Sequence, residues 1–82
     1  MKKDDIVQSL IAFIEKASKR SNLDPDRDIV DMEYINSLII MQLILYIEKE
    51  YEISVDNNVL GSKQFHTING ISEYIFTKIE EM

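Results

Sequence analysis

The 82-residue chain contains no cysteine, only two glycines, one proline and one histidine. The lack of cysteine excludes a disulfide framework and thiolate metal sites, and it suits a reducing compartment. A single histidine also excludes a metal site built from several imidazoles. Because β architectures rich in turns need more glycine and proline, this composition predicts an all-α fold. The length fits one domain, which we expect to cover residues 1–82.

Long hydrophobic runs and an excess of positive charge are also missing. No run of apolar residues is long enough to cross a bilayer, and residues 1–5 turn acidic after two lysines, so they do not resemble a signal peptide. We therefore expect a cytoplasmic protein with no membrane role. The net charge is −6, and residues 23–82 carry four basic and twelve acidic side chains. Phosphate backbones would be repelled, which disfavours nucleic acid as a partner. The acidity could steer the protein toward basic surfaces on enzymes, although solubility alone is a sufficient reason for it.

Apolar spacing predicts a first helix over about residues 3–19. Val7, Leu10 and Ile14 share one face, and neighbouring apolar residues widen it. Asp4 and Asp5 lie at the positive end of the helix dipole. The segment 21–25 then breaks the helix, because turn formers and a proline cluster there, and a long connection leads to residue 36.

A second helix is predicted over residues 37–51, and apolar residues occupy most of its circumference. We assign one arc to the core, consisting of Ile40, Leu43, Ile44, Ile47 and Tyr51. Leu38, Met41 and Leu45 lie on another side, which so small a domain cannot cover completely. Exposed apolar patches often mark binding surfaces, so we expect partners to bind there. Two alternatives stay open: the other helices cover this side, or two copies of the chain dimerise through it.

The remaining sequence predicts a short helical turn and a third long helix. Asp56 can cap a turn that ends near Gly61, whereas residues 53–55 are too isolated to pair as a strand. Thr67 can cap a helix over residues 67–80, in which Gly70 is unfavourable unless close packing requires it. The expected fold is a small four-helix bundle, with three main helices, one short helix and a long first loop.

Asn36, Ser37 and Leu38 place a hydroxyl at the tip of the second helix, where another enzyme could modify it. A hydrolytic triad of Ser37, His66 and a carboxylate is disfavoured, because no glycine-rich elbow surrounds the serine. An EF-hand in the acidic loop is rejected as well, since Ile29 stands where the motif needs glycine and Ile35 where it needs glutamate. We expect no metal site and no enzyme activity. Ser37 is instead interpreted as an attachment point.

This pattern resembles the acyl carrier and peptidyl carrier protein family, which bears 4′-phosphopantetheine on a serine at the start of its second helix. The family carries Asp-Ser-Leu there, and this chain has residues 36–38 as Asn-Ser-Leu. The downstream positions that agree with the family are Met41, Leu43, Ile47, Glu48, Tyr51 and, near the last helix, residues 65–68 and 73–75. Two departures precede the serine, namely Tyr34 in place of glycine and Asn36 in place of aspartate. Asn36 can still cap the helix but removes a charge.

The resemblance implies an arm taken from coenzyme A and attached to Ser37 by a phosphopantetheinyl transferase. A ligase or acyltransferase would load the arm with an acyl or aminoacyl group as a thioester, and downstream enzymes of a fatty-acid, polyketide, peptide or related pathway would receive it. The positions implied for partner binding are Leu38, Ile39, Met41, Gln42, Leu45 and Glu48. Fatty-acid carriers tend to have acids where Ile39, Gln42 and Lys49 stand, which favours a specialised carrier, and we expect a monomer. The alternative function is an unmodified adaptor that binds partners through the apolar face of the second helix.

Overall fold

The structure, a computed structural model, describes residues 2–19, 21–29 and 37–81, except for the side chains of Ser37, Asn57 and Leu60. The helices are α1 (Lys3–Ser18), α2 (Ser37–Tyr51), α3 (Asn57–Leu60), the 3₁₀ helix η1 (Lys63–His66) and α4 (Ile68–Glu80). No strand occurs in these described ranges. The predicted all-α fold, with three long helices and one short one, is confirmed. The 3₁₀ helix was not predicted.

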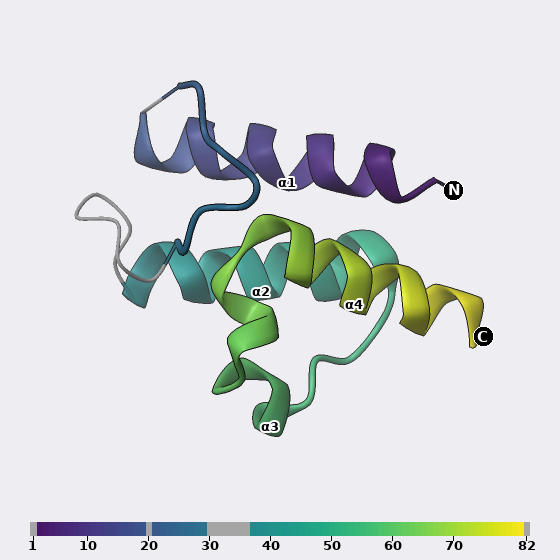
Figure 1. The fold of residues 1–82 in the computed structure, drawn as a ribbon. Helices are drawn as coiled ribbons and strands as arrows, with labels where there is room; N and C mark the ends of the chain where they lie inside the picture. Colours follow the sequence, from purple (N-terminus) through teal and green to yellow (C-terminus); the bar gives the residue numbers. More distant parts are fainter. Residues whose placement is uncertain (1, 20, 30–36, 82) are drawn as a thin grey trace.

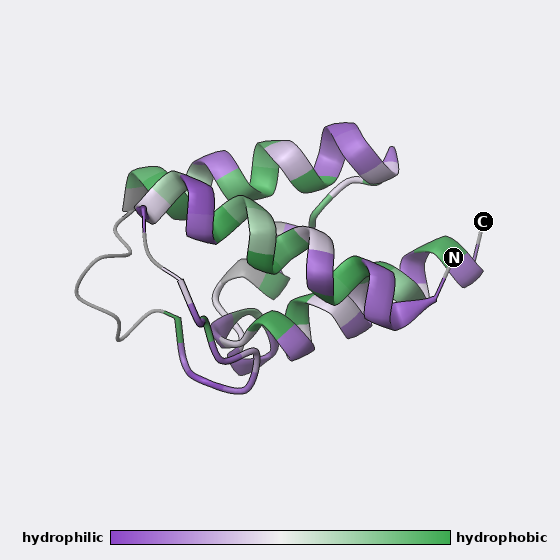
Figure 2. Cartoon of the chain, turned by 90° about the horizontal axis from the view of Figure 1, so that it is seen from above, coloured by the Kyte–Doolittle hydropathy of each residue, from purple (hydrophilic) through white to green (hydrophobic). Residues whose placement is uncertain are grey.

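The three long helices lie alongside one another and enclose one core. Helix α1 packs against both α2 and α4, and α4 also contacts α2, while η1 packs against α4 and, with α3, lies on the side of the bundle away from α1 (Figure 1). Apolar and polar residues follow one another along each long helix (Figure 2), and each of these helices contributes buried apolar side chains to the core. Among the described residues, no helix combines the length and the hydropathy needed to cross a membrane.

Helix α1 buries the face that its spacing predicts. Ile6, Val7, Leu10 and Ile14 are buried. The helix ends at Ser18, because Lys19 adopts a left-handed conformation with φ of 60° and donates its backbone N–H to the carbonyl of Glu15. A left-handed residue of this kind is a common helix terminator, since it satisfies one of the last free carbonyls.

Helix α2 buries a face centred slightly differently from the predicted one. Leu43, Ile47 and Tyr51 are in the core as expected, but Ile39 joins them at 8% exposure. Ile40 and Ile44, which the sequence assigned to the core, are only partly buried. The reason is that apolar residues surround nearly the whole helix, so periodicity alone cannot locate the centre of the buried arc. Contacts from α1 and α4 decide it.

The segment between α2 and α3 is held by side-chain bonds to its backbone. Glu48 Oε2 accepts a hydrogen bond of 2.9 Å from the N–H of Val55, and Ile53 is buried beside it. Asp56 caps α3 by accepting a hydrogen bond of 3.0 Å from the N–H of Asn58. The predicted loop and capped turn are therefore confirmed, with the turn ending at Gly61.

Helix α4 starts in tight contact with η1. The Thr67 hydroxyl accepts a hydrogen bond of 3.0 Å from the N–H of Gly70, which is the predicted cap. A Cβ atom at Gly70 would lie 2.1 Å from the backbone carbonyl oxygen of Gln64, closer than any side chain allows. This contact confirms that close packing is the reason for glycine at position 70. Phe65 of η1 is buried edge-on against Tyr74, with ring centroids 5.4 Å apart.

The described part of the first loop is attached to η1 and the start of α4. The N–H of Ile29 donates to the carbonyl of His66 at 2.6 Å, and the N–H of Asn69 donates to the carbonyl of Pro25 at 3.0 Å. His66 Nδ1 lies 3.3 Å from Asp28 Oδ2. The side chains of Leu23 and Ile29 are buried, so apolar contacts add to these polar ones.

Candidate functional site

Ser37 is the first residue of α2, as the sequence predicts. The Ser37 side chain and all of Asn36 lie outside the described residues, so the predicted exposed hydroxyl and the predicted cap stay predictions. Two described features of α2 bear on what the serine could carry. The helix has 15 residues and no acidic residue in its first turn. Its positive end is therefore suited to an anion such as a phosphodiester.

Three large apolar side chains stand in solvent along the outer side of α2. They are Leu38 at 62% exposure, Met41 at 62% and Leu45 at 60%. No other large hydrophobic side chain among the described residues is as exposed. We call these three residues the α2 stripe. They begin next to Ser37 and continue for two helical turns away from it, as expected for residues at i, i+3 and i+7.

The other three positions implied for partner binding differ from one another. Gln42 is exposed beside the α2 stripe. Glu48 is half-buried, and its carboxylate is already bonded to the backbone of Val55. The prediction that Ile39 binds partners is corrected, because its side chain is buried in the core and is not part of the outer surface. It follows Leu38 by one residue, and a step of about 100° around the helix turns it toward α1 and α4.

A groove between α1 and α2 adjoins the α2 stripe, and the apolar spacing of the two helices did not predict it. It has a volume of about 610 Å³ and is lined mainly by apolar surface from Phe13, Ala17, Leu45 and Tyr46. The rings of Phe13 and Tyr46 stack with centroids 4.7 Å apart and planes inclined by 18°. The Tyr46 hydroxyl is hydrogen-bonded to the Ser9 hydroxyl. The stacking and the hydrogen bond hold the aromatic wall of the groove in place.

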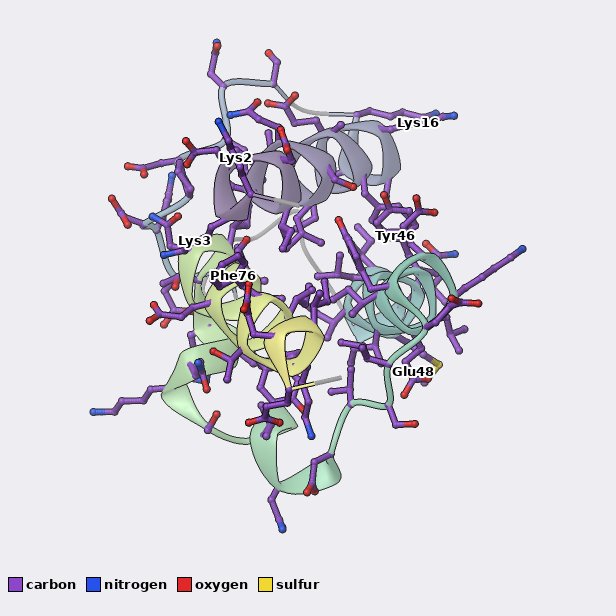
Figure 3. All side chains as sticks on the ribbon, turned by 90° about the vertical axis from the view of Figure 1, so that its right-hand side faces the viewer. Lys2, Lys3, Lys16, Tyr46, Glu48 and Phe76 are labelled. Carbon is purple, nitrogen blue, oxygen red and sulfur yellow. The ribbon has the colours of Figure 1, made fainter. Side chains whose placement is uncertain are left out.

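Two lysines flank this groove, one from each helix. Lys16 of α1 and Lys49 of α2 both contribute to its lining, and none of the described residues that line it is acidic. Lys16 extends from α1 on the side of the molecule where Tyr46 lies between the two helices (Figure 3). Lysine stems are apolar and their ammonium groups stay in water, so such residues can border an apolar surface without disrupting it. The described lining of the groove therefore carries positive charge, although the protein has a net charge of −6.

The contacts of His66 in the structure are explained by a structural role. Its imidazole faces the Asp28 carboxylate and its backbone carbonyl holds Ile29, so its contacts are with the first loop. Within the described ranges, no three His, Cys, Asp or Glu side chains come together in a way that could hold a metal ion.

A family model described as "Phosphopantetheine attachment site" matches residues 5–75, which include most of α1, all of α2, α3 and η1, and more than half of α4. The chain belongs to this family. Domains of the family are sites of covalently attached 4′-phosphopantetheine and are generally not catalytic, so this is a phosphopantetheine-carrying carrier protein. Such domains interact with modifying and acyl-handling enzymes. No curated protein and no solved structure gives a significant match.

Proposed function

We propose that Ser37 is the residue that bears 4′-phosphopantetheine, and that the protein delivers an acyl or aminoacyl group to the enzymes of a specialised pathway. The main support is the position of Ser37 as the first residue of α2, inside the stretch of sequence that matches the family. The described surroundings fit the group, because a helix with no acid in its first turn favours, at its start, the phosphodiester that attachment creates.

The attachment reaction requires only a hydroxyl from this chain. In the active site of a phosphopantetheinyl transferase, Ser37 Oγ forms a bond to the β-phosphorus of coenzyme A. The bond from that phosphorus to the bridging oxygen breaks, adenosine 3′,5′-bisphosphate leaves, and the serine proton passes to a base of the transferase. When bound, the arm supplies a thiol that holds the cargo as a thioester. This chain has no cysteine that could compete for the cargo.

Partner enzymes would bind on the α2 stripe and Gln42, next to the attachment residue. The stripe presents three apolar side chains that each remain about 60% exposed, and covering them is a source of binding free energy. Glu48 would contribute at the edge of this surface while its bond to Val55 keeps its carboxylate in one orientation. Gln42 and Lys49, in place of acids, favour partners other than those of fatty-acid carriers.

Mass spectrometry of the intact protein tests the attachment. Incubation with coenzyme A and a broad-range transferase should add the mass of one arm to the wild type and none to Ser37→Ala. Ser54→Ala, at another exposed serine, is the matched control and should be modified like the wild type. Addition that survives Ser37→Ala would show that another residue is modified.

The same experiment separates this proposal from the adaptor function, which the exposure of the α2 stripe also supports. An adaptor would bind partners through the stripe and receive no arm, so a wild-type protein that gains no mass would favour it. Sedimentation at several concentrations would then distinguish a monomer, which we expect, from a dimer formed through the stripe.

A further inference from the structure

We propose that the groove between α1 and α2 is a docking site for an acidic amphipathic helix of a partner protein. Such a helix would place its apolar side chains on the aromatic wall of the groove and its carboxylates beside Lys16 and Lys49. This inference extends the surface proposed for partners from the α2 stripe onto α1 and names the chemistry of the partner. It does not depend on attachment of the arm at Ser37.

The length of the groove suits a short helix. Along α2 the lining extends from Gln42 to Lys49, which is seven residues or about 10 Å. This distance equals about two turns of a partner helix, which would present apolar anchors at i, i+3 or i+4, and i+7. A volume of about 610 Å³ between the two helices leaves room for those anchors.

The apolar wall of the groove is ordered before any partner binds. The half-buried ring of Phe13 stacks on Tyr46, whose hydroxyl is hydrogen-bonded to Ser9. Ala17 follows Phe13 by one turn of α1 and contributes only a methyl group, so a larger side chain of the partner can lie next to the rings. Because the rings are already fixed, little side-chain entropy is lost there on binding.

The groove is continuous with the α2 stripe. Leu45 belongs to both surfaces and remains 60% exposed. A partner that covers the stripe beside Ser37 can therefore extend onto α1 and bury the groove as well, which removes further apolar surface from water.

The charges of the two flanking lysines are not matched within the described part of the chain. Among the described residues, neither Lys16 nor Lys49 lies within ion-pair distance of a carboxylate. The positions one turn before them on the two helices hold Ala12 and Leu45, so neither lysine has an acid there to pair with. Their ammonium groups are therefore available to carboxylates of another molecule.

The charge at the groove is opposite to that of the whole protein, and this contrast identifies the occupant. The net charge of −6 disfavours close approach of a second copy of the chain or of an anionic membrane. At the groove, an acidic helix meets two lysines and no acid among the described lining residues. Apolar contacts would supply most of the binding free energy, while the charges would fix the register and exclude basic helices.

Two synthetic peptides that differ in charge test the inference. Each is an amphipathic helix of about four turns with leucines at i, i+3, i+4 and i+7, flanked by glutamates in one peptide and by lysines in the other. Backbone amide NMR of the unmodified protein should show shifts at Ala17, Leu45 and Lys49 with the glutamate peptide. Its dissociation constant should be about tenfold lower than that of the lysine peptide. The net charge alone predicts the opposite order, so tighter binding of the lysine peptide, or no binding of either, would overturn the inference.

Reversing the charge at the groove adds a matched control. Lys16→Glu combined with Lys49→Glu should weaken binding of the glutamate peptide about tenfold and strengthen binding of the lysine peptide. Lys2→Glu combined with Lys63→Glu makes the same change in net charge at exposed positions outside the groove. This second variant should still prefer the glutamate peptide. If the two double variants behave alike, the lysines of the groove are not what the peptide recognises, and the inference fails.

Other occupants would give different results. Amide shifts in the groove that grow with protein concentration, without peptide, would assign it to a second copy of the chain. Sedimentation with phosphatidylglycerol vesicles that is lost on reversing Lys16 and Lys49 would assign it to a membrane, and either result overturns the inference. Protein that docks the glutamate peptide but accepts no arm would overturn the proposed function alone. Protein that accepts the arm but binds neither peptide would overturn this inference alone.

Discussion

The inner and outer faces of α2 contain the same kinds of side chain and differ almost completely in burial. Leu43 and Ile47 on the inner face are at most 1% exposed, whereas Leu38 and Leu45 on the outer face are about 60% exposed. An apolar residue on this helix therefore cannot be interpreted from its type alone. The inner face holds the bundle together, and the outer face keeps apolar surface available beside Ser37. The two faces should respond to substitution in opposite ways.

The largest expected difference is in stability. Leu43→Ala should lower the free energy of unfolding by about 2–5 kcal/mol, because it removes buried methyl groups and leaves a cavity. Leu45→Ala deletes the same atoms from an exposed position and should change it by less than about 0.5 kcal/mol. Urea denaturation of both variants measures the two values. Equal losses would mean that the outer face is also packed.

A second comparison concerns two glutamates near the end of α2. Glu48→Ala should cost about 1–2 kcal/mol of unfolding free energy, since the N–H of Val55 loses a charged acceptor. Glu50→Ala, at an exposed position, should be nearly neutral. Thermal denaturation of the two variants compares them. If both are neutral, the bond from Glu48 does not contribute to holding the loop after α2.

The outer face should matter for modification and not for folding. Replacing Leu38 and Met41 together by Gln should lower kcat/KM for the phosphopantetheinyl transferase about tenfold, or about 1.4 kcal/mol, while the unfolding free energy changes little. Ala12→Gln, at an exposed position of α1, is the control for a new surface amide. An unchanged rate in the double variant would remove the α2 stripe from the transferase interface.

The smallest expected effect is on the dependence of stability on pH. Burial raises the pKa of Tyr51 above its ordinary value of 10.0, so the unfolded chain ionises this phenol first. Its contribution to stability is complete below about pH 10 and is lost as the pH rises through the folded-state pKa. Tyr51→Phe should therefore lose less stability between pH 9 and 11 than the wild type, measured by urea denaturation. Parallel curves for the two proteins would show that Tyr51 titrates alike in both states.

Local signals predicted the helices well. The bounds of α2 follow from its apolar run, and the caps at Asp56 and Thr67 are side chains that bond to a backbone N–H two or three residues away. Such interactions depend on neighbouring residues, which the sequence displays directly. The position of Ser37 at the start of α2 could be predicted in the same way, because the serine motif and the beginning of the apolar run coincide.

Features that depend on contacts between distant segments could not be predicted. The choice of Ile39 over Ile40 for the core depends on how α1 and α4 lie against α2. The groove requires Phe13 to meet Tyr46, and the Ser9 hydroxyl bonds to a residue 37 positions away. The bond from Glu48 to Val55 also forms only when the chain turns back after α2. Apolar periodicity describes each helix separately and does not predict contacts between residues of different segments.

The contact between Gly70 and Gln64 limits which residues can replace the glycine during evolution. A methyl group at position 70 would collide with the carbonyl oxygen of Gln64, and the same turn holds Ile29 through His66. Alanine, which suits an ordinary helix better than glycine does, is therefore barred here by a neighbour rather than by backbone conformation. Relatives that lack this glycine should also differ in the backbone of the turn where the long first loop contacts the start of the last helix.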